Sequence, residues 1–322
     1  MERDFDVFEP KQYIEKAVAD IRAKVGDGKA LLALSGGVDS SVCAALMSRA
    51  IGKNFIAIFV NTGLMRKHEP DEVSDAFSGG EMDFRLIDGE ARFLAKLAGV
   101  TDPEKKRKII GEEFIRVFEE EARKAGKVDY FVQGTIYPDV IESGLDGNRQ
   151  VKSHHNVGGM PKDIEFKAVI EPLRPLYKEE VRALGRELGL PAAITERQPF
   201  PGPGLAVRCL GELTKERLDL LRDVDWIFRD EVAKAGLADK INQYFAILTS
   251  LRSTGVTEGA RTYDNTVALR AVTTHDFVTA DWVKLPWEVL EATGDRISKE
   301  VRGVNRVVYD ITKKPPSTIE WE

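Results

Sequence analysis

The sequence predicts a doubly wound parallel α/β sheet followed by a smaller α+β domain. Between residues 10 and 188, short apolar runs alternate with helical patterns, which is typical of a sheet built from parallel strands. A turn of small residues, Ser35 to Ser41, separates the first apolar run from a helix. A stretch rich in proline and glycine, 198–204, ends this alternation, and a different pattern follows it.

The first part of the chain alternates helices and strands. Apolar residues at helical spacing, Ile14, Val18, Ile21 and Val25, predict the first helix. Continuous apolar runs are usual for parallel strands that are buried on both faces, and 55–60 is such a run. The expected helices are 10–25, 39–50, 90–98, 102–124 and 178–188, and the expected strands are 30–34, 55–60, 82–87 and 130–133.

Strand ends locate the expected site. Ligands of a doubly wound sheet bind in a crevice beyond the carboxyl ends of its strands. The expected strands end near Leu34, Val60 and Gln133. Because parallel strands end at the same edge of a sheet, we expect these positions to converge on one crevice.

The stretch 198–204 is the predicted domain boundary. Its three prolines and two glycines exclude a helix or a central strand. We therefore expect a first domain over 1–197, a linker over 198–204 and a second domain over 205–322. For the second domain the sequence predicts helices at 215–234 and 285–302, and strands at 241–251, 264–273 and 306–311.

Composition excludes several protein classes. The 322 residues carry a formal net charge of −6, which argues against a dedicated nucleic-acid-binding protein. No apolar stretch reaches the length of about 18 residues that a membrane-spanning helix needs, and the acidic start of the chain is unlike a signal peptide. We expect a cytoplasmic protein. Cys43 and Cys209 are expected to pack as small apolar groups, because no Cys-x-x-Cys pair exists.

The string Ser35-Gly-Gly-Val-Asp-Ser-Ser41 follows an apolar strand and opens a helix. Its glycines let the backbone come close to a ligand, and the free N–H groups at the helix start attract an anion. Asp39 offers a carboxylate to Mg²⁺, which prefers carboxylate and phosphate oxygens. No lysine follows the glycines, so this is not a Walker A loop. The string predicts a polyphosphate site, with ATP as the expected ligand; the alternative is an ordinary glycine turn.

Residues 144–165 are rich in glycine, asparagine, histidine and lysine and show little apolar periodicity. This composition fits a mobile lid over a ligand, and it fits a plain surface loop equally well. The adjacent His154 and His155 lack the spacing of helical metal ligands, which argues against a metal site there.

The loop resembles the signature of the N-type ATP pyrophosphatases, which cut ATP between the α- and β-phosphates. Along its full length the chain closely resembles the ATP-pyrophosphatase part of the glutamine-hydrolysing GMP synthetase family. Seven strings carry the resemblance: Ser35–Ser41, Asn61–Lys67, Lys106–Gly111, Gln133–Ser143, Lys152–Gly159, Pro199–Leu205 and Lys313–Glu322.

The resemblance implies an enzyme that converts XMP, ATP and ammonia into GMP, AMP and pyrophosphate. It implies that the C2 oxygen of XMP attacks the α-phosphate and that ammonia then displaces AMP from C2. It further implies an N-type ATP-pyrophosphatase fold, bound Mg²⁺, and a homodimer formed by the C-terminal domain. In such a dimer, apolar groups such as Val307, Val308 and Tyr309 would be buried between protomers; a monomeric core is the alternative.

Site residues are carried over from the resemblance. For ATP it implies Ser35, Gly36, Gly37, Val38, Asp39, Ser40, Ser41, Val60 and Gly134. The implied catalytic residues are Asp39, Ser40 and Lys152, the implied metal ligands are Asp39 and Asp139, and the implied XMP ligands are Arg107, Gln243, Lys314 and Glu320. Asp139 has an alternative interpretation as a structural cap, and Lys314 and Glu320 have one as parts of a frayed terminus.

The chain departs from the family in two ways. Gln198 stands where many members carry histidine, which puts an imidazole role at that position in doubt. Neither cysteine lies in a Gly-x-Cys-x-Gly string, and no segment of glutaminase length precedes the loop. We therefore expect the two-subunit arrangement typical of archaea, in which a separate glutaminase subunit supplies ammonia.

Several rivals share the loop. A tRNA-thiolating enzyme would need catalytic cysteines and a basic face for RNA, and neither is evident. NAD synthetase and argininosuccinate synthetase lack the proline–glycine linker and the Glu-Trp-Glu tail. A regulatory module that binds ATP without turnover is the non-enzymatic alternative, against which Asp39 and the tail argue.

Overall fold

The computed structural model describes residues 8–142, 166–257, 259–274 and 278–322. Its internal contacts divide the chain into two compact units. The first unit comprises residues 1–61, 69–89 and 111–197, and the second comprises 62–68, 90–110 and 198–322. The main segment of the second unit thus begins at the first residue of the predicted linker.

Two short segments of the predicted first domain, 62–68 and 90–110, pack with the second unit. Arg66 in the first of them forms an ion pair with Asp225, 3.5 Å from Nε to Oδ2, and both side chains are almost fully buried. Such pairing between residues far apart in the chain has no signal in local sequence periodicity, so a boundary read from the sequence does not show it.

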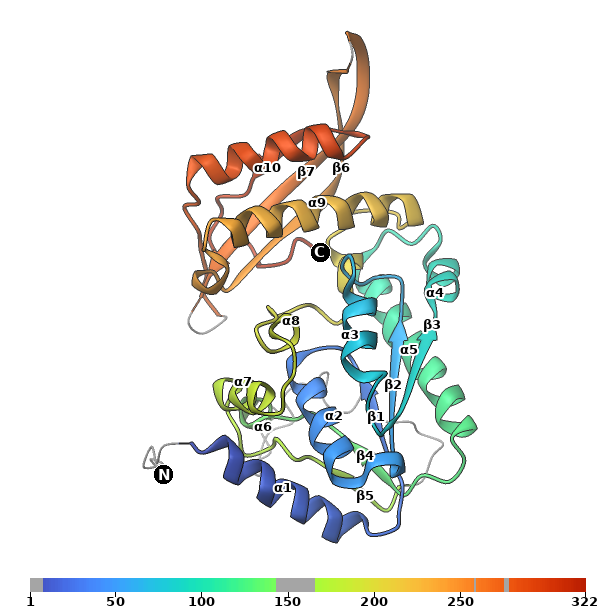
Figure 1. Cartoon of the computed structure of the whole chain (residues 1–322). Coiled ribbons are helices and arrows are strands. Elements are labelled where there is room, and N and C mark those ends of the chain that lie inside the picture. The colour runs from blue at the N-terminus through green and yellow to red at the C-terminus, as the bar shows by residue number, and fades with distance from the viewer. Residues whose placement is uncertain (1–7, 143–165, 258, 275–277) are drawn as a thin grey trace. The chain divides into compact units, whose positions relative to one another are not determined.

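The first unit is built on a five-stranded sheet with the order β3-β2-β1-β4-β5, in which every neighbouring pair is parallel (Figure 1). This sheet confirms the predicted fold class. Its fifth strand is not among the strands that the sequence predicted. The strands are β1 Ala30–Leu34, β2 Phe55–Asn61, β3 Asp83–Asp88, β4 Tyr130–Val132 and β5 Ala168–Ile170.

The strand order reverses at β1. Leu31 of this strand is paired with Ile56 of β2 on one side and with Phe131 of β4 on the other. The chain leaves β1 toward β2 and β3 and later returns to the opposite side of β1 to form β4 and β5. Such a reversal leaves a crevice beyond the carboxyl ends of β1 and β4, where α/β proteins bind their ligands.

Helices cover this sheet. Helix α2 packs against β1, and α1, α2 and α7 pack against one another. The side chain of Phe118 in α5 meets Phe131 of β4 edge to face, with ring centroids 6.1 Å apart. The helices of this part of the chain are α1 Pro10–Val25, α2 Val38–Ile51, α3 Glu69–Phe77, α5 Pro103–Lys124, α6 Tyr137–Glu142, α7 Lys178–Glu187 and α8 Ala192–Thr195, with a 3-10 turn η1 at Gly52–Asn54.

The second unit contains a four-stranded mixed sheet in which β7 is central. It pairs antiparallel with β6 and β8 and parallel with β9. Helix α9 packs on β6, α10 packs on β9, and the two helices pack on each other. The elements are α4 Glu90–Leu97, η2 Gly204–Val207, α9 Lys215–Lys234, η3 Ala238–Lys240, β6 Gln243–Thr257, β7 Ala260–Thr273, β8 Asp281–Trp282, α10 Trp287–Glu300 and β9 Val304–Tyr309.

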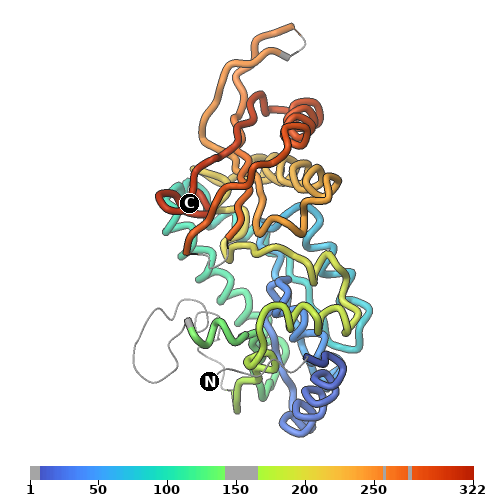
Figure 2. The backbone as a smooth tube through the Cα atoms, turned by 90° about the vertical axis from the view of Figure 1, so that its left-hand side faces the viewer, coloured from blue at the N-terminus to red at the C-terminus, as the bar shows by residue number. Residues whose placement is uncertain are grey.

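Strands β6 and β7 are longer than predicted and form a two-stranded ribbon that extends past α10 (Figures 1 and 2). The sequence predicted strands only over 241–251 and 264–273. The distal half of the ribbon is exposed, with Leu251, Val256 and Tyr263 more than half accessible to solvent. Without a buried face, this half shows no alternation of apolar and polar residues, which is why the prediction stopped short.

A buried arginine holds the C-terminal tail of the second unit. Arg270 of β7 is fully buried, and each of its five N–H donors has an acceptor. The acceptors lie along residues 310–319: Asp310 Oδ2 at 2.6 Å, Thr312 O at 3.1 Å, Ser317 Oγ at 3.1 Å, Thr318 O at 2.8 Å and Ile319 O at 2.8 Å. This network fixes the tail against the sheet, and Ile319 packs on the core cluster of Phe245, Ile247 and Ala268.

Two further buried cations hold the end of the tail. The guanidinium of Arg208 donates to both carboxylate oxygens of Glu320, at 2.7 and 3.0 Å, and lies 3.8 Å from the ring centroid of Phe245. The ammonium of Lys106 is fully buried and donates to Glu322 at 2.5 Å and to two backbone carbonyls. The last three residues are therefore part of the folded unit, not a frayed terminus.

Among the helices that the structure describes, none has both the length and the apolar character needed to cross a membrane. Both cysteines are buried, as expected. Burial raises the pKa of the Cys43 thiol well above its ordinary value, and the carboxylate of Asp39 adds to this effect. The protonated thiol lies 3.5 Å from the carbonyl oxygen of Gln133.

The proline–glycine stretch offers a matched pair for testing its packing. Gly204 has φ +62°, and a Cβ there would overlap the carbonyl oxygen of Leu64, whereas a Cβ at Gly202 would meet nothing within 4 Å. Gly204→Ala should lower the free energy of unfolding by about 2–4 kcal/mol, from the left-handed backbone and the overlap together. Gly202→Ala should change it by less than about 0.5 kcal/mol. Urea unfolding of both variants measures this; equal stabilities would contradict the packing of Gly204 on Leu64.

The contacts that hold the C-terminal tail on the second unit should weaken in acid. Burial opposes ionisation of Asp310, but hydrogen bonds from Thr312 and Trp321 and the charge of Arg270 outweigh it, so its folded pKa lies below the ordinary value. The stabilisation is therefore complete above the unfolded pKa, about 3.9, and is lost as the pH falls through the lower folded pKa. Asp310→Asn should be less stable than the parent by about 3 kcal/mol at pH 6, with the gap narrowing as the pH falls below the unfolded pKa of about 3.9.

Urea unfolding from pH 6 to pH 3 measures this gap. Asp281→Asn is the matched control, because Asp281 pairs with Lys313 on the exposed surface. A gap between parent and Asp310→Asn that stays constant with pH would show that the carboxylate of Asp310 does not hold the tail.

Candidate active site

The loop after β1 is closed by its own serines. Ser35 Oγ lies 2.9 Å from Ser40 Oγ, and Ser40 Oγ donates to the carbonyl of Gly37 at 3.1 Å. Gly36 has φ +75°, a conformation that glycine adopts without strain. Gly37 is the N-cap of α2, with extended backbone at φ −72° and ψ 163°. The loop thus presents the start of a 14-residue helix at the carboxyl end of β1, which is a ready site for an anion.

A cavity of about 270 Å³ lies at this strand end. Its lining comes from the ends of β1 and β4 and from the first turn of α2: Leu32, Ala33, Ser35, Gly37, Asp39, Ser40, Phe131, Val132, Gln133, Gly134 and Thr135. Gly134 lets these two segments approach, because a Cβ there would lie 3.2 Å from the backbone of Asp39 and of Ser40. The strands that end near Leu34 and Gln133 meet at this cavity as expected, whereas Val60, the third expected position, is buried and is not among the described lining residues.

Lys178 reaches the same site from a distant part of the chain. Its ammonium donates to both carboxylate oxygens of Asp39, at 2.8 and 2.9 Å, and both side chains are partly exposed. Lys178 is the first residue of α7, where the side chain of Glu180 accepts the N–H of Tyr177 at 2.7 Å and caps the helix. Asp39 and Lys178 are 139 residues apart, so no local motif could have identified this pair.

The other residues predicted for ATP and metal fall into two groups. Gly36, Val38, Ser41 and Val60 are buried, and none of the four is among the described residues that line the cavity. Asp139 is not among the described residues that line the cavity; its carboxylate accepts the N–H of Ile136 at 3.0 Å, which matches its interpretation as a structural cap. Lys152 and the predicted lid over 144–165 lie outside the described residues.

The donor set suits Mg²⁺ bound together with a polyphosphate. Among the described residues, no group of three or more His, Cys, Asp or Glu side chains could hold a metal ion by itself. Mg²⁺ is commonly held by one or two carboxylates plus phosphate oxygens and water. The partly exposed carboxylate of Asp39, at the mouth of an anion site, fits this pattern.

The residues predicted for XMP all belong to the second unit. Gln243 is the buried first residue of β6, and the backbone of Lys314 pairs with Ala280. Arg107 is partly exposed and pairs with Glu104 on its own helix at 2.5 Å. Glu320 is held by Arg208.

The cations that contact the tail were missed by the sequence analysis. Lys106, next to Arg107, is the α5 side chain that reaches the tail, and Arg208 holds Glu320. Gln198, where the family often has histidine, uses its side-chain oxygen to accept the N–H of Tyr244 at 3.1 Å. It therefore has a structural contact with the start of β6 that needs no imidazole.

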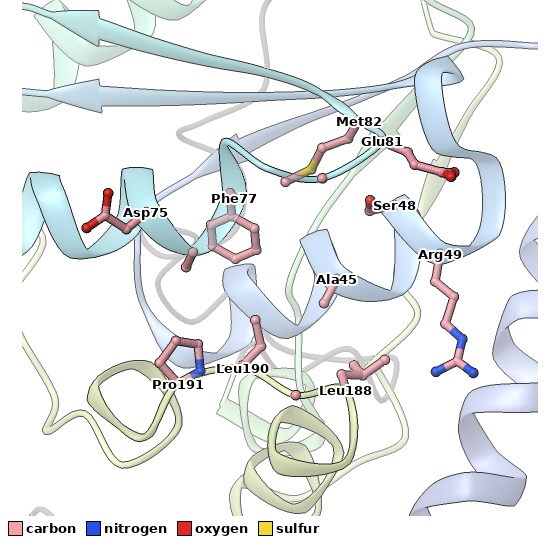
Figure 3. A pocket seen from close by; sticks show the side chains of 13 residues that line it. Ala45, Ser48, Arg49, Asp75, Phe77, Glu81, Met82, Leu188, Leu190 and Pro191 are labelled. Atoms are coloured by element: carbon pink, nitrogen blue, oxygen red, sulfur yellow. The ribbon is translucent and has the colours of Figure 1, made fainter.

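A larger cavity, of about 650 Å³, lies elsewhere in the first unit (Figure 3). It is formed by the second half of α2, the end of α3 and residues 188–191, with Phe77, Met82 and Leu190 among its apolar side chains. None of its described lining residues belongs to the loop 35–41. The candidate site is therefore identified by its chemistry and not by the size of its cavity.

Comparisons with known proteins agree with this geometry. The family model described as GMP synthase C terminal domain matches residues 230–321, and the model described as NAD synthase matches residues 10–79. A GMP synthase (glutamine-hydrolyzing) from Finegoldia magna is 62% identical over 312 residues, which cover 97% of this chain and 61% of that protein. The corresponding protein of Acetivibrio thermocellus is 63% identical over 312 residues, which cover 96% of this chain and 61% of the relative.

Among solved structures, an NH₃-dependent NAD synthetase from Campylobacter jejuni is similar to 58% of this chain, with a TM-score of 0.44 and 20% identity. The chain spans 61% of the length of the curated relatives named above. One family model matches a segment near the start of the chain and the other a segment near its end, and sequence identity above 60% extends over nearly the whole chain. Over nearly its whole length the chain is therefore similar to the GMP synthases.

Proposed function

We propose that this chain carries out the ATP-dependent amination of XMP, giving GMP, AMP and pyrophosphate. The observation that carries the proposal is the anion site at the end of β1, where the loop and Asp39 line one cavity and Lys178 pairs with Asp39. The names of the relatives, GMP synthase, support XMP as the second substrate.

In the first step the C2 oxygen of XMP attacks the α-phosphorus of ATP. The new bond joins this oxygen to phosphorus, the bond from the α-phosphorus to the bridging oxygen breaks, and pyrophosphate leaves with that electron pair. The N–H groups at the start of α2 and the ammonium of Lys178 offset the charge that develops on the leaving pyrophosphate. Positioning of the two substrates supplies much of the remaining rate gain.

In the second step the nitrogen of ammonia attacks C2 of adenylated XMP. AMP leaves with the former C2 oxygen, and the nitrogen loses a proton to give the amino group of GMP. Water would compete with ammonia at C2, so the site has to exclude it. We propose that Lys152 and the segment 144–165 serve this step, as the resemblance implies.

Bound Mg²⁺ would neutralise charge on the phosphates, with Asp39 as its proposed protein ligand. The carboxylate of Asp39 is shared with Lys178. The two side chains thus place one negative and one positive group at the phosphates, which orients both the cation and the nucleotide. For XMP we propose Arg107 and Lys314 toward the 5′-phosphate, and Gln243 and Glu320 toward the base and ribose.

We also propose the partners that the sequence predicted. The relatives are named as glutamine-hydrolyzing, which supports a glutaminase as the source of ammonia. We propose that this glutaminase is a separate subunit. We further propose a homodimer through the second unit and a cytoplasmic location. Val308 on β9 is partly exposed, which leaves apolar surface on that strand for a second copy.

Removal of either charge at the loop should abolish most turnover. Asp39→Asn and Lys178→Met should each lower XMP-dependent pyrophosphate release by about 10²-fold or more, because each removes a group that faces the reacting phosphates. Lys16→Met is the matched control, since Lys16 forms an exposed ion pair with Asp20 on α1. A coupled pyrophosphate assay measures the rates; full activity in Lys178→Met would exclude its proposed role.

The nitrogen source separates the proposed arrangement from its rivals. With ATP, Mg²⁺, XMP and ammonium salt, the purified chain should form GMP and AMP in equal amounts, measured by chromatography. With glutamine in place of ammonium it should form neither, because the proposed source of ammonia is a separate glutaminase subunit. Turnover with glutamine would overturn the separate subunit, and absence of GMP with both donors would overturn XMP as substrate.

A further inference from the structure

The peptide between Gly36 and Gly37 is held from behind by an arginine of the first unit. The carbonyl oxygen of Gly36 accepts a hydrogen bond from Arg197 Nη1 at 2.6 Å. The N–H of the same peptide, on Gly37, is directed to Ser35 Oγ at 3.3 Å. In a trans peptide the carbonyl and the N–H point in opposite directions, so the arginine fixes the direction of the N–H as well.

The direction of this N–H matters for an anion. Ser35 and Gly37 line the cavity at the end of β1, and Gly36 is not among its lining residues. If the peptide turned over, the carbonyl oxygen of Gly36 would face the cavity and repel a phosphate. Two adjacent glycines make such a rotation sterically easy, so the contact with Arg197 restrains the most flexible point of the loop.

Arg197 itself lies in a packed environment. Its guanidinium also forms an ion pair with Glu69 of α3, and both side chains are largely buried, at 11% and 5% exposure. A Cβ on Gly36 would lie 3.2 Å from Arg197 Nη1, 3.0 Å from Val73 and 3.3 Å from Phe59. The back of the loop therefore contacts the protein interior, where Arg197 lies beside the apolar side chains of Val73 and Phe59.

The segment that carries Arg197 is anchored to α7. Arg182 donates to the carbonyls of Thr195 and Arg197, at 2.5 and 3.1 Å. Arg182 is four residues after Lys178, so the two side chains share one face of α7. The helix that brings Lys178 to Asp39 thus also fixes the arginine behind the loop, and both sides of the anion site depend on α7.

We propose that Arg197 is a positioning residue for the nucleotide phosphates. It keeps the Gly36–Gly37 peptide in the orientation that turns its N–H toward the cavity, and Glu69 and Arg182 keep Arg197 in place. The inference rests on the proposed function, because it requires that the loop binds the phosphates of ATP. Arg197 is not among the described residues that line the cavity, so it would support ground-state binding of the phosphates through the loop.

The test compares two variants that differ only in the loop contact. Glu69→Gln removes the charge of Glu69 but leaves Arg197 able to donate to Gly36. The double variant Glu69→Gln with Arg197→Gln loses that donor without leaving Glu69 as an unpaired buried carboxylate, because a glutamine is too short to reach the carbonyl. Titration calorimetry of the full chain with ATP and with AMP, each with Mg²⁺, measures the effect.

The double variant should bind ATP about tenfold more weakly than Glu69→Gln, the loss expected for one hydrogen bond from a charged donor. AMP lacks the β- and γ-phosphates, so its dissociation constant should differ by less than about twofold between the two variants. A purely structural role would weaken both nucleotides alike. Equal affinity of the two variants for ATP, or an equal loss for ATP and AMP, would overturn the proposal.

Arg197→Lys guards against a double variant that does not fold. Its single ammonium keeps the charge opposite Glu69 but lacks the planar fork that serves Glu69 and Gly36 together, so the same selective loss for ATP is expected. Arg186→Gln is the control, because Arg186 pairs with Glu196 on the surface of the same segment. Failure of the proposed function is a separate result: the parent chain itself would then bind no ATP.

Discussion

Unpaired backbone N–H groups at the start of α2 can bind an anion only while the loop before the helix keeps one shape. Two glycines make the close approach possible, but they also leave the backbone free to rotate. The structure removes this freedom with side chains from several elements. Ser35 and Ser40 bond within the loop, Arg197 holds its carbonyl from behind, and Gly134 lets the end of β4 pack against the first turn of α2. The parallel sheet supplies the frame, because β1 and β4 end side by side where the strand order reverses.

The second unit depends on a different physical constraint, the burial of positive charge. Lys106, Arg208 and Arg270 have no exposed side-chain surface. Buried charges are costly unless they are paired and hydrogen-bonded, and here the partners come mainly from the last 13 residues of the chain, from Asp310 to Glu322. The tail therefore completes the unit: without it, three buried cations would lose their carboxylates. The same contacts hold Glu320 in place, so its proposed role toward XMP starts from a fixed carboxylate.

These two constraints bear on the proposed chemistry in different ways. The loop and Lys178 place positive groups where pyrophosphate would leave, which is electrostatic preorganisation at the reacting phosphates. The tail network instead fixes the frame on which the proposed XMP ligands lie. The chain spans 61% of the length of its curated relatives. An assay with ammonium tests the proposed amination step without a glutaminase, because ammonia is then supplied directly.

The sequence alone predicts the parallel α/β sheet, the loop from Ser35 to Ser41 and the change of pattern after Gln198. Each is a local signal: an apolar run, a string of small residues, or a cluster of prolines and glycines. It also left open whether Asp139 is a metal ligand or a cap, and the structure shows its carboxylate on the N–H of Ile136.

Which distant charges meet depends on the tertiary structure. Lys178 reaches Asp39 over 139 residues, Arg197 reaches Gly36 over 161, and Lys106 reaches Glu322 over 216. Such pairs leave no periodicity in the sequence, because they depend on how strands are ordered and where helices pack. The exposed ribbon of β6 and β7 escaped prediction for a related reason: its length comes from cross-strand pairing, and an exposed strand needs no apolar alternation.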